Sequence, residues 1–256
     1  MDTAKMPGHW LLARMGKRVL RPGGVVMTGR LLDALTIGPD DDVVEFAPGL
    51  GMTARETLKR HPKSFTAIER DQAAAEMVRQ YLQGDHQKCV VAGAAATGLA
   101  SQCATVVYGE AMLTMQPVEE KRRIVGEAAR LLKPGGRYGI HEFALVPDDI
   151  AESIRKELIR DISTSIHHTA IPLTVSQWCE LLSSKGLEIV TQTAVSMSLL
   201  GPRRLIRDEG LGRALRFVWN VARNGQARRR VLAMRRTFRK YQDHIKAIML
   251  VGRKTS

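Results

Sequence analysis

A glycine-rich turn with an acid at its start is the strongest sign of chemistry in this chain. The run Glu45-Phe46-Ala47-Pro48-Gly49-Leu50-Gly51 joins an expected strand at 43–46 to an expected helix at 52–60. Glycines at such a turn let the backbone approach a ligand without an intervening side chain. The carboxylate of Glu45 stands at the strand end, where it would attract a cationic amino-acid ligand. The run therefore predicts a ligand-binding turn.

The same turn also fits a dinucleotide fingerprint. Gly49-x-Gly51-x-x-Ala54 is followed by Glu69, eighteen residues after Gly51. An NAD-dependent oxidoreductase is therefore an alternative interpretation. Two features disfavour it: the carboxylate of Glu45 would repel a pyrophosphate, and the run LLKPGG at 131–136 leads into the expected fifth strand.

Three signals together resemble the class I S-adenosylmethionine-dependent methyltransferases. Residues 45–51 resemble the family's first motif, and LKPGG at 132–136 resembles its late motif. Glu69 closes the expected second strand, as the family's ribose-binding acid does. The order and spacing match over residues 43–141, and a further helix–strand unit and a terminal strand extend the match to most of the chain. The resemblance implies S-adenosylmethionine as cofactor and methyl transfer to a small-molecule or lipid-like acceptor.

The resemblance also implies a set of cofactor-binding residues at the turn and at neighbouring strand ends. They are Glu45, Ala47, Pro48, Gly49, Gly51, Glu69, Arg70, Gly93, Ala94 and Glu110. Two positions depart from the family pattern, since Ala47 replaces the usual first glycine and Ala94 replaces an acid that often contacts the adenine amino group. Adenine would then be held by backbone groups and apolar contacts, with Arg70 as a flanking side chain.

Candidates for catalysis lie beyond the carboxyl ends of the expected strands. Methyl transfer from a sulfonium is an in-line displacement, so alignment and exclusion of water can supply much of the acceleration. A general base is needed only for a nucleophile that is protonated near neutral pH. His141 is the first choice for that base, with a hydrogen-bonded structural histidine as the alternative. Glu142, His167 and His168 are the candidate acceptor-binding residues, and no metal site is expected because the histidine pair lacks further ligands.

The residues after the expected fourth strand argue against some acceptors. Tyr108-Gly109-Glu110-Ala111 stands where enzymes that methylate amino groups of nucleic-acid bases carry an Asn-Pro-Pro-Tyr motif. No Pro-Cys pair supports attack on cytosine C5, which needs a cysteine nucleophile. Methylation of nucleic-acid bases is therefore disfavoured, whereas ribose methylation stays open.

An alternation of short apolar runs and helical stretches must position these residues. Strands are expected at 43–46, 65–69, 88–92, 104–108, 137–141, 187–191 and 245–252, and helices at 52–60, 71–83, 118–132 and 174–185. The alternation predicts an α/β fold with a parallel sheet between helices. We expect a Rossmann-like, doubly wound, seven-stranded sheet with an antiparallel last strand, spanning 43–256. Residues 1–42 are expected to form an N-terminal helical cap, with helices at 9–20 and 28–35.

A basic helical insertion is expected at 196–244. Residues 203–240 hold thirteen Arg or Lys and two acids, Asp208 and Glu209, which accounts for nearly all of the net charge of +13. Apolar residues recur at helical spacing in two stripes. One stripe is Leu211, Leu215, Val218 and Ala222, and the other is Ala227, Val231, Met234, Phe238, Tyr241 and Ile245. We expect the two helices to fold over the cofactor as a lid that closes the acceptor pocket.

Three interpretations of the basic lid stay open: a solvated face, transient contact with an anionic membrane, and RNA binding, which the sparse aromatic residues disfavour. A basic adaptor that keeps the fold without catalysis is the corresponding alternative function. The three cysteines have no metal-ligand spacing and are expected to be buried thiols in a reducing cytoplasm. A peripheral position at the membrane would follow from the second interpretation, and the sequence carries no sign of the oligomeric state.

Overall fold

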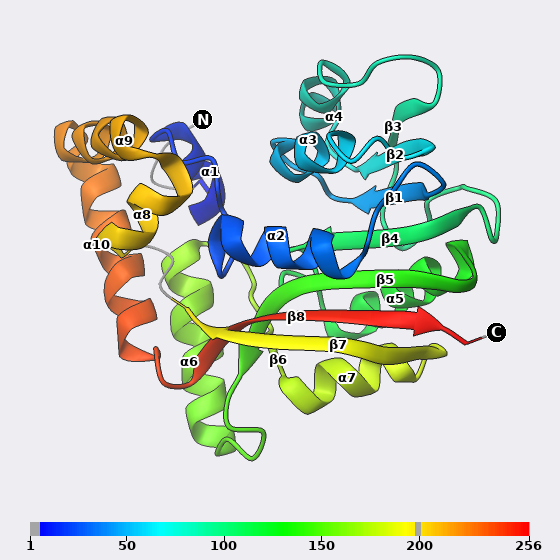
Figure 1. Ribbon diagram of the computed structural model, residues 1–256. Helices are drawn as coiled ribbons and strands as arrows, with labels where there is room; N and C mark the ends of the chain where they lie inside the picture. Colours follow the sequence, from blue (N-terminus) through cyan, green and yellow to red (C-terminus); the bar gives the residue numbers. More distant parts are fainter. Residues whose placement is uncertain (1–5, 198–200, 256) are drawn as a thin grey trace.

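The centre of the molecule is one twisted β-sheet (Figure 1). The computed structural model describes residues 6–197 and 201–255, and within them eight strands join in one sheet. The strands are β1 Asp42–Phe46, β2 Ser64–Glu69, β3 Gln87–Val91, β4 Ala104–Glu110, β5 Leu132–Leu145, β6 Leu173–Thr174, β7 Leu187–Ser196 and β8 Ile245–Lys254. Their order is β3-β2-β1-β4-β5-β8-β7, and β6 pairs with β5. Among these strands β8 alone runs antiparallel to the others, which confirms the predicted Rossmann-like sheet with an antiparallel last strand. The described sheet has eight strands and not the predicted seven, because the two-residue β6 adds to β5.

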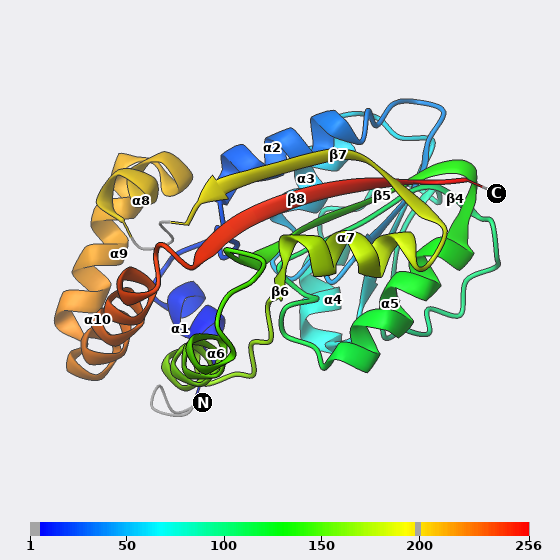
Figure 2. The same cartoon turned by 90° about the horizontal axis from the view of Figure 1, so that it is seen from below.

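Helices cover both faces of the sheet and gather at one end of it (Figures 1 and 2). They are α1 Gly8–Arg14, α2 Gly24–Ala34, α3 Met52–Leu58, α4 Gln72–Arg79, α5 Val118–Leu131, α6 Glu152–Ile166, α7 Val175–Ser183, α8 Pro202–Glu209, α9 Leu211–Arg223 and α10 Gly225–Lys240. One hydrophobic cluster joins α2, α3 and α4 to the sheet, and a second joins α5 and α7 to it. A third cluster, formed by α1, α6, α8, α9 and α10, lies beyond the end of the sheet.

The fifth strand is much longer than expected. The sequence predicts it at 137–141, but β5 begins at Leu132, which pairs with Ala104 of β4, and it extends to Leu145 because β8 pairs with it from Arg137 to Leu145. The run LKPGG therefore opens the strand instead of preceding it. His141 consequently lies within the strand, and not at its carboxyl end.

The helical parts of the chain also differ in part from the prediction. Helix α6 was not predicted, although its buried residues Leu158, Ile162 and Ile166 recur every fourth position. Helix α8 was not predicted either. The first expected helix, 9–20, ends at Arg14, and the chain continues to Gly23 without helix.

Of the two predicted apolar stripes of the insertion, one is buried and the other is exposed. In α10 the predicted stripe is buried, but it packs toward α6 and not over the acceptor pocket as predicted. In α9 the prediction is wrong, because the buried residues are Ala214, Phe217 and Val221. The predicted stripe, represented by Leu211 and Leu215, faces solvent. Figure 2 shows α8, α9 and α10 together at one end of the molecule.

Candidate cofactor and acceptor site

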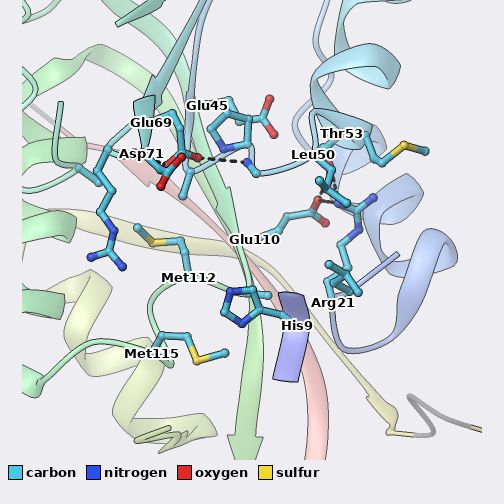
Figure 3. A pocket seen from close by; sticks show the side chains of 18 of the residues that line it. His9, Arg21, Glu45, Leu50, Thr53, Glu69, Asp71, Glu110, Met112 and Met115 are labelled. Carbon is cyan, nitrogen blue, oxygen red and sulfur yellow. Dashed lines mark hydrogen bonds and ion pairs between the residues drawn. The ribbon is translucent and has the colours of Figure 1, made fainter. Parts of the chain in front are cut away.

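A cavity of about 330 Å³ lies at the carboxyl ends of β1, β2 and β4, where ligands bind in open α/β sheets (Figure 3). Its volume is within the range of small-molecule sites. The cavity has two walls. The sheet wall comes from the glycine turn and the strand ends, with Glu45, Glu69 and Glu110. The helical wall comes from the N-terminal residues and the segment after α6, with His9 and His168.

The turn of the sheet wall has a left-handed backbone at three positions. Ala47, Gly49 and Gly51 have φ values of 51°, 55° and 68°. A Cβ added at Gly49 would meet no atom within 4 Å, so this glycine leaves open space beside the cavity. A Cβ at Gly51 would come within 2.8 Å of Tyr81, so Gly51 is required by packing and does not itself line the cavity. The turn thus brings bare backbone to the ligand space at Gly49.

Glu69 is held in position by backbone groups. One carboxylate oxygen accepts a hydrogen bond from Gly49 N at 3.3 Å, and the other accepts one from Asp71 N at 3.1 Å. The side chain is buried but lines the cavity. Because each carboxylate oxygen can accept more than one hydrogen bond, Glu69 keeps capacity for two vicinal hydroxyls.

Glu45 is a buried acid with an unused oxygen. Its Oε2 has no hydrogen-bond partner among the described residues, and the side chain lines the cavity. Burial raises the pKa of Glu45 to about 8. A cationic group in the cavity would supply the missing partner and stabilise the carboxylate. This orphaned oxygen therefore fits the ammonium group of an amino-acid ligand.

Glu110, by contrast, is fully engaged. Its two oxygens contact Arg21 Nη1 at 3.0 Å, Thr28 Oγ1 at 2.7 Å, Thr53 Oγ1 at 2.5 Å and His141 Nδ1 at 2.7 Å. Burial alone would raise its pKa, but Arg21 and the hydrogen bond from His141 outweigh burial and lower the pKa to about 2. Figure 3 shows Arg21 reaching Glu110 across the cavity edge. Glu110 thus joins the N-terminal cap to the sheet as a carboxylate.

His141 and Glu142 are fully buried, and neither lines the cavity. Glu142 accepts hydrogen bonds from the backbone N–H groups of Met112, Leu113 and Thr114, so it fixes the loop after β4. Neither side chain reaches the cavity directly, so this geometry lends no support to His141 as the base or to Glu142 as an acceptor-binding residue. The longer β5 places both side chains inside the fold, where they position other groups.

The half of the cavity next to the helical wall is mainly aromatic and apolar. It is lined by His9, Trp10, Met112, Met115, Gln116, Phe143 and His168. The rings of His9 and His168 meet edge to face at 6.0 Å between centroids. Burial, with smaller effects of His168 and Arg70, lowers the pKa of His9 to about 4. Figure 3 shows His9 beside Met112 and Met115.

The remaining predicted residues divide between the cavity and the surroundings. Ala47, Pro48, Arg70 and Ala94 line the cavity with the residues already described, whereas Gly93 does not. His167 is the exposed C-cap of α6, so only His168 of the histidine pair reaches the cavity. Sequence reasoning missed His9, Trp10, Met115, Phe143 and Arg21, which come from segments without any local motif.

The helical wall is fastened from behind by α8. Glu209 accepts hydrogen bonds from Arg18 N at 2.8 Å and Val19 N at 2.9 Å, and Asp208 accepts one from Val25 N at 3.2 Å. The Lys17 ammonium is buried 3.7 Å from Glu209 and 3.8 Å from Asp208. The only two acids of the basic segment thus hold the loop that carries Arg18 and Arg21 into the cavity.

The prediction that the insertion itself closes the pocket is wrong. No described residue of α8, α9 or α10 lines the cavity. The insertion reaches it only indirectly, since Phe238 of α10 stacks behind Phe143 at 6.1 Å between ring centroids. The N-terminal cap, with His9 and Trp10, provides the cover that the lid was expected to give.

Within residues 6–197 and 201–255, no group of three or more His, Cys, Asp or Glu side chains is arranged to hold a metal ion. No helix there has the length and apolar character needed to cross a bilayer.

Comparisons with known proteins find one matching family model, a relative of similar length and solved structures of the same fold. Residues 44–140 match the family model described as methyltransferase domain. An uncharacterized protein of Haemophilus influenzae is 30% identical over 251 residues, which cover 96% of this chain and 98% of that protein.

Three solved structures share the fold of this chain at low sequence identity. The crystal structure of MccD protein has a TM-score of 0.71 at 19% identity, covering 90% of this chain and 96% of that one. The [4+2]-cyclase SpnF has a TM-score of 0.67 at 17% identity, covering 90% and 80%. Geranyl diphosphate C-methyltransferase from Streptomyces coelicolor, in complex with S-adenosyl-L-homocysteine and an analogue of geranyl diphosphate, has a TM-score of 0.65 at 16% identity, covering 90% and 76%. Together with the glycine turn and the acids of the sheet wall, the match to the methyltransferase domain makes the chain a member of the class I S-adenosylmethionine-dependent methyltransferases, with S-adenosylmethionine as its cofactor.

Proposed function

We propose that this methyltransferase acts on a small organic acceptor whose apolar body binds against the helical wall. The observation that carries the proposal is the division of the cavity, which continues from the acids of the sheet wall into a space lined by Trp10, Met115 and Phe143. Two imidazoles, His9 and His168, are the polar groups that face each other in that space. A pocket with an apolar lining and few polar groups is typical of small-molecule recognition.

We assign the polar groups of the cofactor to the carboxylates of the sheet wall that can still accept hydrogen bonds. Glu45 would accept the ammonium group, and Glu69 would accept the ribose hydroxyls. The bare backbone at Gly49 would lie against the ligand, with Ala94 and Arg70 beside the adenine. When bound, S-adenosylmethionine supplies an electrophilic methyl group on a sulfonium.

The chain's own residues would then align the acceptor and manage its proton. His9 is neutral at physiological pH because burial lowers its pKa to about 4, so its ring can accept a hydrogen bond from a hydroxyl or amine. His168 Nδ1 lies 3.0 Å from the backbone oxygen of Thr169, and donation to that oxygen leaves its Nε2 as an acceptor. Met112, Met115 and Phe143 would exclude water from the reacting atoms.

A lipid-like acceptor is one member of this class. The fold comparison includes enzymes named for geranyl diphosphate, an apolar chain with an anionic head. In this chain Arg18 lines the cavity next to Leu20, so an acceptor with an acidic group and an apolar body would meet complementary side chains. These contacts support the proposal without defining the methylated atom.

The test uses S-adenosylmethionine with a deuterated methyl group and a small-molecule extract of cells. We expect mass spectrometry to find a metabolite that carries the label with the wild-type protein and not with Glu69→Ala. His9→Phe should reduce labelling while leaving cofactor affinity unchanged, whereas His61→Phe, at an exposed histidine outside the cavity, is the matched control. Cofactor binding with label found only in protein or RNA would overturn the proposal.

A further inference from the structure

Helix α9 exposes a continuous apolar face. The exposed fractions are 62% for Leu211, 61% for Leu215, 54% for Val218 and 61% for Trp219. Residues spaced by three or four positions share one side of a helix, so these side chains form one stripe. We call these four residues the outer stripe. Large apolar side chains in such a continuous arrangement indicate an interaction surface.

The outer stripe is not left over from poor packing. A neighbouring side of α9 is also apolar, and its residues Ala214, Phe217 and Val221 are buried in the third hydrophobic cluster. Asn220 donates a hydrogen bond to Met15 O at 3.0 Å, which fixes the rotation of α9 against the N-terminal cap. A rotation that buried the outer stripe would expose Phe217 instead. The helix therefore has two apolar sides, of which one packs against the rest of the protein and the other is exposed.

Exposed arginines lie on α9 and on the two helices that contact it, α8 and α10. They are Arg203, Arg207, Arg216, Arg223, Arg228, Arg229, Arg235, Arg236 and Arg239. None of these forms an ion pair with an acid among residues 6–197 and 201–255. The guanidinium of Arg223 lies 5.3 Å from the centroid of the Trp219 ring. The two acids of the segment, Asp208 and Glu209, point inward to the cap, so the outer side is cationic.

We propose that α9 docks on an anionic phospholipid bilayer. The outer stripe enters the boundary between headgroups and acyl chains, and the exposed arginines contact lipid phosphates. A helix that lies in the interface has an apolar side flanked by basic residues, and tryptophan is favoured at this depth. Guanidinium groups pair with phosphate oxygens in a bidentate way, which suits a surface of many phosphates.

The charges on α9 and its neighbours favour lipid over two other partners. A second copy of the chain would bring two sets of unpaired arginines together, which costs free energy. Single-stranded nucleic acid uses several aromatic side chains for stacking, whereas the outer stripe offers Trp219 alone and otherwise aliphatic residues. The bilayer satisfies both the apolar and the cationic part of the surface.

The first experiment measures binding to vesicles by flotation. We expect the protein to float with phosphatidylcholine vesicles that contain phosphatidylglycerol, and to bind at least about tenfold more weakly to phosphatidylcholine alone. Binding should fall as salt rises from about 0.05 M to about 0.5 M, because the Debye length shortens. The emission of Trp219 should shift to the blue on binding, and Trp219→Phe should remove that shift although Trp10 and Trp178 remain.

The second experiment compares matched variants. Leu215→Ser combined with Trp219→Ser should weaken binding to the anionic vesicles about tenfold or more, since two inserted side chains are lost. Arg216→Gln combined with Arg235→Gln should weaken it about tenfold and flatten the salt dependence. The control is Val190→Ser, because Val190 is 45% exposed on β7, away from the insertion. Circular dichroism and cofactor affinity should be unchanged in all variants.

Four results would overturn the proposal. They are no flotation with anionic vesicles, equal binding to neutral vesicles, equal binding by Leu215→Ser/Trp219→Ser and wild type, and an unshifted Trp219 emission. Self-association that Leu215→Ser abolishes, or salt-dependent binding to an oligonucleotide without vesicle binding, would assign the surface to one of the other partners. None of these outcomes bears on the methyl acceptor, so this proposal and the proposed function can fail separately.

Discussion

The two walls of the cavity are built in different ways. The sheet wall is local, because its turn, Glu45 and Glu69 lie within 25 residues and are held by backbone bonds of adjacent strands. The helical wall depends on contacts between distant segments, such as the bond from Val19 N to Glu209, 190 residues apart. The two walls are therefore held in place by separate sets of contacts, so a change in one wall need not disturb the other. They meet at Glu110, where Arg21 of the cap joins the end of β4.

The largest expected effect comes from cutting the support of the helical wall. Glu209→Ala leaves Lys17 buried with one acid fewer and leaves the N–H groups of Arg18 and Val19 without their acceptor. Removing one partner of a buried ionic cluster costs about 3–5 kcal/mol. Urea denaturation should therefore show a fall of that size in the free energy of unfolding.

The part of the protein that Glu209→Ala destabilises shows whether the two walls are supported separately. Hydrogen exchange should speed up at residues 15–25 and not at the sheet wall, if the two walls are supported separately. Glu152→Ala, at an exposed acid on α6 that pairs with Lys156, is the control and should change stability by less than about 0.5 kcal/mol. A uniform increase in exchange along the chain would contradict the division into two walls.

The second effect concerns the sheet wall. Glu69→Ala removes the acceptor of Gly49 N and Asp71 N together with the proposed ribose contacts. Charge-assisted hydrogen bonds contribute about 1.5–3 kcal/mol each before losses, so cofactor affinity should fall roughly tenfold to a hundredfold. Calorimetry measures this, with Glu76→Ala on the exposed side of α4 as the control. Unchanged affinity would reject the assignment of Glu69.

A third, smaller effect is a pH dependence that only Glu45 should produce. Without ligand its pKa is raised to about 8, and a bound ammonium group should lower it, so cofactor binding releases a proton below pH 8. The dissociation constant should therefore decrease as pH rises from about 6 to about 8, by at most about tenfold per unit, and level off above. Calorimetry in buffers of different ionisation enthalpy should detect the proton.

The ligand-free protein should show the opposite trend in stability. Because folding raises the pKa of Glu45 from 4.5 to about 8, its contribution is fully present below pH 4.5 and is lost as pH rises through 8. Glu45→Gln should flatten both profiles. A cofactor affinity that still depends on pH in this variant would show that another group titrates.

The smallest expected effect tests the turn. Ala47 has φ of 51°, a left-handed conformation that costs an L-residue about 1–2 kcal/mol relative to glycine. Ala47→Gly removes that cost but adds chain entropy of about 0.5–1 kcal/mol. Thermal unfolding should therefore show a gain in stability of between about 0 and about 1.5 kcal/mol. A loss of stability would mean that the Ala47 methyl group, which borders the cavity, makes packing contacts that outweigh the strain.

The sheet and its cofactor acids could be predicted because their signals are local. A glycine turn after a strand and an acid at the next strand end are adjacent in sequence and need no distant partner. The same reasoning placed His141 at the end of a strand, whereas β5 continues to Leu145. The length of β5 is set by pairing with β8, about a hundred residues later, and no feature of the sequence near 141 records that.

The helical wall could not be predicted for the same reason. His9 and Arg21 lie in segments whose positions depend on α6 and α8, and neither helix was predicted. In α9 the spacing of Leu211, Leu215 and Val218 is as helical as that of Ala214, Phe217 and Val221. Periodicity alone cannot decide between two apolar sides, and the decision is made by the packing of α9 on the cap.

The placement of β8 has a consequence for how the chain is made. Within the described sheet β7 pairs with β8 alone, and β8 lies between β7 and β5 although it is the last strand in the sequence. During synthesis the cofactor turn and β1 to β4 can therefore assemble early, while residues 187–196 must wait for about fifty more residues to be translated. In the nascent protein the part of the sheet with the cofactor turn would therefore form before β7 is added at the opposite edge.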